Sequence, residues 1–146
     1  MSYHCGSVWA HDTAIVAAGL ARAGFGAEAT TLIDGLLTAG EVFGYRLPEL
    51  HAGDARAELS RPMSYPAACR PQAWSAAAAV LMLQTAIGLE PDVPEGRIRL
   101  RPLPGAPFGA ISVSGLEIAG AAVDVRVDTS GAATITGLTS GLTLQP

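Results

Sequence analysis

The stretch Tyr3-His4-Cys5-Gly6-Ser7-Val8-Trp9-Ala10-His11-Asp12 combines a glycine turn, a tryptophan and several polar groups, and an apolar run from Ala14 to Leu20 follows it. The apolar run predicts a helix from Asp12 or Thr13, either of which could cap it, to about Ala23. Because apolar residues occupy every side of this helix, we expect it to be buried all round. A polar, aromatic loop that leads into a helix is a common way to build a binding site.

Two further helices are expected in the first part of the chain. Apolar residues at helical spacing predict one from Ala27 to Phe43, with Gly44 as its stop. Pro71 suits the first turn of another, which runs from Gln72 to about Ile87. Between them lies the segment Tyr45 to Arg70, which contains three prolines and no clear periodicity. Loops of this length inside compact domains are often functional.

The composition changes after Glu90, where Pro91, Pro94 and Gly96 mark a linker. Short β-like runs separated by turn residues follow it. The runs are Ile98-Arg99-Leu100, Ile111-Ser112-Val113, Ala122 to Val127, Thr134-Ile135-Thr136 and Leu142-Thr143-Leu144. Turns are expected at Gly115, Gly120, Ser130-Gly131 and Ser140-Gly141. We therefore predict an α+β protein, with a helical segment of about three helices over residues 1–90 and a small antiparallel β domain over residues 91–146.

Composition narrows the class of protein. Hydrophobic residues make up 49% of the 146 residues and charged residues 15%, which is too apolar for a disordered chain. The net charge of −4 and the absence of a basic cluster argue against a nucleic-acid partner. The longest apolar run, Ala76 to Leu83, is too short to span a membrane, and no signal peptide is visible. With only two cysteines, a cytoplasmic protein with reduced thiols is expected.

Two segments besides the first stretch carry candidate chemical groups. In Arg46-Leu47-Pro48-Glu49-Leu50, a carboxylate stands among apolar neighbours, and desolvation would raise its pKa and suit it to proton transfer. The alternative is a glutamate in solvent or paired with Arg46. In the segment from Tyr65 to Trp74, Gln72 could reach a sugar hydroxyl and Trp74 could stack on a sugar ring. The alternative is that Trp74 is a core residue and Gln72 completes the first helical turn.

Metal and nucleophile chemistry have weaker support. The possible ligands His4, Cys5, His11, His51 and Cys69 match no closed zinc pattern, so no metal or other cofactor is expected. Ser7 lacks the second glycine of a nucleophile elbow.

Taken in order, three motifs resemble the C-terminal part of bacterial amylo-α-1,6-glucosidases of the glycogen-debranching type. They are His-x-Gly-Ser-Val-Trp-x-His-Asp from His4, Arg-Leu-Pro-Glu-Leu from Arg46, and Tyr-Pro-x-Ala-Cys-x-Pro-Gln-Ala-Trp from Tyr65. The resemblance covers nearly the whole chain, including the β-rich tail. It implies an (α/α)6 toroid, of which this chain would supply about three helices, and an α-glucan or oligosaccharide as the ligand.

The resemblance also implies roles for individual residues. Glu49 would be the general base that activates water in an inverting hydrolysis of α-1,6 branches. The residues implied in substrate binding are His4, Trp9, His11, Asp12, Gln72 and Trp74. This sequence departs from the family pattern at Cys5, where asparagine is usual, and at Ala10, where proline is usual. The first change removes an amide donor and acceptor from the sugar site.

Glycoside hydrolysis needs a second carboxyl group as proton donor. The family's general acid lies upstream of the first motif, so we expect a truncated C-terminal piece of the enzyme that is inactive alone. One alternative is a non-catalytic, self-associating or carbohydrate-binding module derived from such an enzyme. Another is a small α+β domain whose resemblance is only ancestral. The expected partners are the missing N-terminal portion or a second copy of the chain. The residues expected to bury the second copy are Ile15, Val16, Leu20, Val80 and Leu83.

Overall fold

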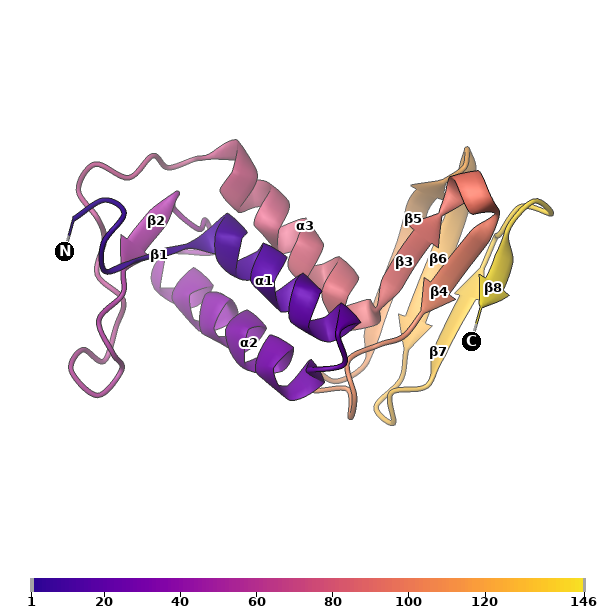
Figure 1. Cartoon of the computed structure of the whole chain (residues 1–146), viewed down its shortest axis with the longest axis horizontal. Coiled ribbons are helices and arrows are strands. Elements are labelled where there is room, and N and C mark those ends of the chain that lie inside the picture. Colours follow the sequence, from indigo (N-terminus) through magenta and orange to yellow (C-terminus); the bar gives the residue numbers. More distant parts are fainter. Residues whose placement is uncertain (1, 146) are drawn as a thin grey trace. The chain divides into compact units, whose positions relative to one another are not determined.

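The computed structural model describes residues 2–145 and shows an α+β protein (Figure 1). The chain divides into two compact units, Met1–Met82 and Leu83–Pro146. This division lies inside helix α3 (Ala73–Ile87), whereas the sequence suggested a boundary between residues 90 and 91. The first unit carries most of the helical residues and the second carries most of the strands.

Helices α1 (Ala10–Arg22) and α2 (Gly26–Val42) form a hairpin in the first unit (Figure 1). A short turn joins them, and Gly24 within it adopts a φ of 89°, which glycine accepts without strain. The residues that the hairpin buries are small on α1 and larger on α2. They are Ala10, Ala14, Ala17 and Ala18 on α1, and Ala29, Ile33, Leu36, Ala39 and Gly40 on α2.

Two expectations for α1 were wrong. The helix begins at Ala10, before Asp12 and Thr13, so neither caps it, and the Thr13 hydroxyl donates to the Trp9 carbonyl at 2.8 Å. The helix is also not buried all round, because its alanine face packs while Ile15 is 59% exposed and Val16 is 53% exposed. Apolar residues on every side of this helix therefore do not mean that every side is buried.

A two-stranded antiparallel ribbon lies in the first unit beside the helical hairpin. Strand β1 (Ser7–Trp9) pairs with strand β2 (Leu50–Ala52) in the register Ser7–Ala52, Val8–His51 and Trp9–Leu50. The sequence predicted loops at both places. The ribbon ties the first stretch of the chain to the middle of the long segment between α2 and α3.

The second unit contains two three-stranded sheets. The first holds β3 (Leu89–Asp92), β4 (Arg97–Leu100) and β8 (Thr143–Gln145), with the short helix η1 (Val93–Glu95) between β3 and β4. The second holds β5 (Ile111–Ile118), β6 (Ala121–Val127) and β7 (Ala133–Thr136). Buried side chains from both sheets and from the end of α3 form one core, made of Ile87, Leu89, Ile98, Ile118, Val123, Val125 and Val127.

Three details of this unit differ from the sequence prediction. The segment expected to be a linker contains β3. This strand tolerates Pro91 because it lies at the edge of its sheet and pairs with β4 alone. Strand β8 runs parallel to β4, so the unit is not purely antiparallel. Gly115 does not end a strand but lies in a bulge of β5, where its N–H donates to Oδ1 of Asp124 at 2.9 Å.

None of the helices described over residues 2–145 combines the length and the hydrophobicity that a membrane-crossing helix requires.

Gly88, which follows α3, provides a test of backbone packing. It has a φ of 65°, and a Cβ atom there would lie 1.8 Å from the carbonyl oxygen of Arg101. We expect Gly88→Ala to lower the free energy of unfolding by more than ~3 kcal/mol, because it adds a backbone clash to an unfavourable φ. Urea denaturation followed by circular dichroism measures this loss.

The matched control is Gly120→Ala, since Gly120 also has a positive φ of 77° but has open space around its Cβ position. That variant should lose only about 1–2 kcal/mol. Equal losses of unfolding free energy in the two variants would show that the close approach of Gly88 to the Arg101 carbonyl does not determine the cost of the substitution.

Exposed apolar residues of helices α1 and α3 lead to a second prediction. Ile15, Val16 and Val80 are each more than half exposed, and Leu83 is exposed as well, whereas Leu20 is only half-buried. Because exposed apolar clusters favour association, we expect the chain to self-associate at micromolar concentration. Light scattering of the double variant Ile15→Glu, Val16→Glu should then return a smaller species than the original chain. Ala27→Glu, which adds a charge at an exposed position of α2, should leave the size unchanged; monomers in all three samples would contradict the prediction.

Candidate functional site

A pocket of about 330 Å³ collects almost all of the site residues predicted from the sequence. We call it the Glu49 pocket. Its lining residues are Tyr3, His4, Trp9, His11, Asp12, Glu49 and Trp74. Gln72 does not line it, and its Oε1 instead accepts the backbone N–H of Ala73 at 3.0 Å, at the start of α3. Gln72 lies just before α3 rather than within its first turn, and its carbonyl oxygen accepts the N–H of Ala76 at 3.1 Å.

Three local contacts bring these distant segments together. The pairing of Trp9 with Leu50 in the β1–β2 ribbon sets the residue before Leu50, Glu49, close to Trp9. The backbone N–H of Glu49 donates to the Cys69 carbonyl at 2.9 Å. The buried hydroxyl of Ser75, in the first turns of α3, donates to the Pro48 carbonyl at 2.9 Å and fixes the helix beside this segment.

Glu49 is buried, with 5% of its surface exposed, and both of its carboxylate oxygens are held. The Tyr3 hydroxyl donates to Oε1 at 2.6 Å, and the Cys69 N–H donates to Oε2 at 3.2 Å. A carboxylate in this geometry can still accept a proton from a further donor, because each oxygen has a second lone pair.

The expected direction of the Glu49 pKa was wrong. The hydrogen bond from Tyr3 lowers the pKa of Glu49 below its usual value, with a smaller contribution from the Cys69 N–H, and these outweigh the opposing effect of burial. The same contact raises the pKa of the Tyr3 hydroxyl to about 12, because its proton is shared with a carboxylate. Glu49 is therefore ionised at neutral pH and Tyr3 is a hydrogen-bond donor.

The walls of the pocket are aromatic. The His4 ring stacks on Trp9, with 5.1 Å between centroids and 7° between planes, and the His11 ring stacks on Trp74 at 4.6 Å and 16°. Trp9 and Trp74 meet edge to face at 6.5 Å. Trp74 is 45% exposed, so the interpretation of Trp74 as a core residue is wrong. The two tryptophans offer apolar surface to a ligand beside polar ring nitrogens.

His11 and Asp12 form the polar edge of the pocket. Nε2 of His11 lies 3.1 Å from Oδ1 of Asp12, whose side chain is 66% exposed. The buried Nδ1 of His11 has no hydrogen-bond partner within residues 2–145. The imidazole of His11 and the carboxylate of Asp12 therefore each retain capacity to form a hydrogen bond with a ligand.

Sequence reasoning did not assign a role to Tyr3, which lies immediately before the first motif. The available signal was its position next to His4 in an aromatic loop, but its contact with a glutamate 46 residues away is not visible in a local pattern. Cys5 is exposed with a free thiol and is not a lining residue, and the Cys69 thiol is also free. Within residues 2–145, no group of three or more histidine, cysteine or acidic side chains could hold a metal ion.

Comparisons of the chain with protein-family models, with curated proteins and with solved structures found no match.

The contact between Tyr3 and Glu49 predicts a pH dependence. We expect Tyr3→Phe to raise the pKa of Glu49, measured by NMR titration of its carboxyl carbon, because the variant removes the hydrogen bond that lowers it. A lowered pKa in the folded state stabilises the fold above the unfolded-state pKa, and this stability disappears as the pH falls through the folded-state pKa. The variant should therefore be less stable than the original chain at neutral pH and equally stable in acid.

Tyr45→Phe is the matched control, since Tyr45 is 82% exposed and lies outside the pocket lining. It should leave the titration of Glu49 unchanged. A Glu49 pKa that is the same in Tyr3→Phe and in the original chain would contradict the assignment of this hydrogen bond.

Proposed function

We propose that the Glu49 pocket binds an α-linked glucan or oligosaccharide, and that Glu49 acts as the general base of an inverting glycoside hydrolase of the amylo-α-1,6-glucosidase type. The observation that carries this proposal is an ionised carboxylate held between two hydrogen-bond donors at a pocket walled by tryptophan and histidine rings. The three motifs that resemble this family supply six of the seven lining residues of that pocket; Tyr3 lies just before the first motif, and the motif residue Gln72 does not line the pocket.

The lining suits a sugar in two respects. Tryptophan faces provide flat apolar surface for the C–H face of a sugar ring, and the edges of the pocket carry groups for its hydroxyls. The rings of Trp74, which is 45% exposed, and of the half-buried Trp9 are the ones we assign to stacking. His4, His11 and Asp12 are the groups we assign to hydroxyl recognition.

The proposed chemistry follows from the state of Glu49. In an inverting hydrolysis, an ionised carboxylate removes a proton from a water molecule, which attacks the anomeric carbon from the face opposite the leaving group. A carboxylate with a lowered pKa is in the required form at neutral pH. Tyr3 and the Cys69 N–H would hold the carboxylate in position while its remaining lone pairs receive the proton of the water.

We do not assign the role of proton donor, the general acid, to any of the seven lining residues. The resemblance places it before the first motif, in a helical toroid whose last hairpins would correspond to α1, α2 and α3. Positioned general acids contribute about 10²–10⁴-fold to such reactions. We therefore expect the chain alone to bind oligosaccharide with little or no turnover, and to need a further portion of the enzyme for full activity.

A non-catalytic carbohydrate-binding module is the second candidate. It is favoured by Asp12, the only other carboxyl group in the pocket lining, which is exposed and is engaged with His11. In either case the free thiols of Cys5 and Cys69 suit the reducing cytoplasm, which we propose as the location.

The test uses isothermal titration calorimetry and product analysis with panose, isomaltose and limit dextrin. We expect Trp9→Ala to weaken binding by roughly tenfold or more, because it removes the stacking surface. Glu49→Gln should retain binding and abolish any residual turnover. Glu41→Gln, a change at an exposed position of α2, is the matched control and should preserve both.

Turnover separates the two candidates. Turnover that Glu49→Gln abolishes supports the enzyme and contradicts the module, whereas binding without turnover supports a sugar site and is expected of both candidates for the chain alone. Turnover that survives Glu49→Gln would remove the base assignment. No binding of any of the three sugars at millimolar concentration would contradict both candidates.

A further inference from the structure

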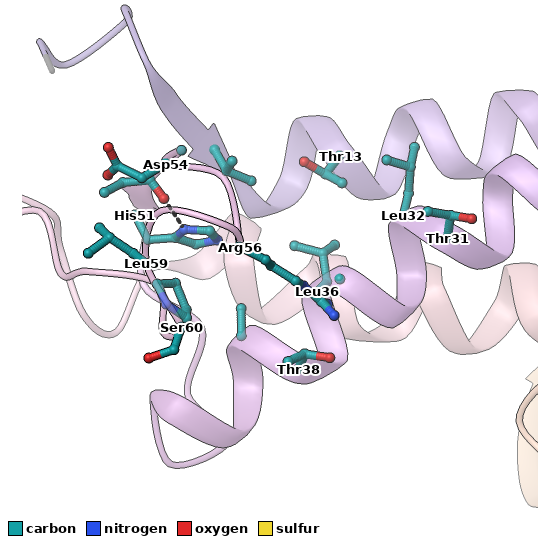
Figure 2. Close-up of a pocket in the computed structure, with 16 residues that line it drawn as sticks. Thr13, Thr31, Leu32, Leu36, Thr38, His51, Asp54, Arg56, Leu59 and Ser60 are labelled. Atoms are coloured by element: carbon teal, nitrogen blue, oxygen red, sulfur yellow. Dashed lines mark hydrogen bonds between the residues drawn. The ribbon is translucent and has the colours of Figure 1, made fainter.

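The β1–β2 ribbon has a second face, which borders another pocket. Trp9 faces the Glu49 pocket, and because side chains alternate along a strand, Val8 and its partner His51 point to the opposite face. There they line a pocket of about 300 Å³ between the ribbon, α2 and the loop that follows β2 (Figure 2). We call it the His51 pocket.

The His51 pocket is mainly aliphatic. Val8, Leu32, Leu36, Ala39 and Leu59 provide its apolar surface. Charged groups are confined to exposed residues, Asp54 and Arg56, and the Arg56 side chain extends along one wall toward Leu36 and Thr38 (Figure 2).

Its threonine hydroxyls are already engaged with the helices. Oγ1 of Thr13 donates to the Trp9 carbonyl at 2.8 Å, Oγ1 of Thr31 to the Ala27 carbonyl at 3.0 Å, and Oγ1 of Thr38 to the Asp34 carbonyl at 2.8 Å. None of these three protons is therefore available to a ligand.

His51 is the polar group that this pocket leaves unsatisfied. The residue is 7% exposed, and its Nδ1 lies 2.8 Å from the Ala52 carbonyl oxygen. A carbonyl only accepts hydrogen bonds, so the ring proton resides on Nδ1. Burial lowers the pKa of His51, so the ring is neutral at pH 7.

Nε2 of His51 therefore carries a lone pair. It is buried and has no hydrogen-bond partner within residues 2–145. A buried acceptor without a partner is unfavourable, and a ligand that donates a hydrogen bond would relieve it.

We propose that the His51 pocket binds a small neutral alcohol or phenol. Its hydroxyl donates to Nε2 of His51, and its apolar body packs on Leu32 and Leu36. The volume is near the lower end of ligand pockets, which range over about 300–1,000 Å³, so a single ring suits it.

The chemistry of the lining separates this ligand from other classes. An anion is disfavoured because the neutral His51 ring presents a lone pair to the ligand rather than a proton, and because Arg56 in the lining already faces a carboxylate, with its Nη2 3.8 Å from Oδ2 of Asp34. A glucan is disfavoured because aliphatic walls and engaged threonine hydroxyls offer few partners to its many hydroxyl groups. The Glu49 pocket, with its tryptophan faces, has the opposite character.

The test compares phenol with anisole, which has the same ring but no hydroxyl proton. Binding is followed by NMR of the histidine ring nitrogens, with the His51 signal identified by its loss in His51→Phe. We expect phenol to shift the Nε2 signal of His51 and to bind roughly tenfold more tightly than anisole, as a buried hydrogen bond implies. His51→Phe should bind the two compounds equally, measured by the shifts of backbone amides around the pocket.

A blocking variant avoids dependence on the buried histidine. Gly35 lines the pocket on α2, and a Cβ atom there would meet nothing within 4 Å, so Gly35→Leu can add a side chain at the lining without a backbone clash. It should abolish the shift of the His51 signal. The matched control is Gly19→Leu on α1, where a Cβ atom likewise meets nothing within 4 Å and which lies outside the lining; it should preserve phenol binding.

Three results would overturn the proposal. They are equal affinity of phenol and anisole for the original chain, a His51 shift that persists in Gly35→Leu, and no shift of the His51 signal at millimolar phenol. A shift caused by glucose but not by phenol would assign the pocket to sugars and contradict the ligand class. Phenol that stacks on Trp9 alone leaves the His51 signal unchanged, and so counts against the proposal.

Discussion

The pairing of β1 with β2 is the constraint on which both pockets depend. Three residue pairs join the start of the chain to a segment more than forty residues later. One face of this ribbon presents Trp9 beside Glu49, and the other presents Val8 and His51. A shift of register by one residue would exchange these faces, so the aromatic pocket and the aliphatic pocket would both lose their central residues. The loop backbone supports the register from the far side, because the Ala52 N–H donates to the Met63 carbonyl at 2.9 Å.

The sequence predicted the long elements well and the short ones poorly. Apolar spacing placed a helix at Ala27 to Phe43, and the structure has it at Gly26–Val42. The alternating valines of β6 are all buried, as period-two patterning implies. Strands β1, β2 and β3 were not predicted, because three or four residues carry no measurable periodicity and their conformation depends on a distant partner. Long-range pairing, rather than local preference, makes these residues strands.

For the candidate site, the sequence likewise predicted one property and not another: it predicted which residues line the pocket better than it predicted their electrostatic state. The three motifs were enough to select six of the seven residues that line the Glu49 pocket, but they missed Tyr3 and included Gln72, which does not line it. The predicted direction of the Glu49 pKa was wrong, because apolar neighbours in the sequence suggested desolvation alone. The donor that reverses the shift, Tyr3, is remote in sequence and reaches the carboxylate only after the ribbon has formed. Predicting a pKa from sequence therefore requires the hydrogen-bond partners, whereas the type and order of the residues predicted most of the lining.

The bulge in β5 has a consequence for how the second unit behaves in a crowded solution. Strand β5 is at the edge of its sheet, where unpaired backbone groups could pair with another chain and begin aggregation. The irregularity between Val113 and Leu116 interrupts the regular row of donors and acceptors there. Asp124 of the paired strand β6 accepts the N–H of Gly115 and so holds the bulge in place. A single glycine and a single aspartate thus make this edge a poor template for strand addition.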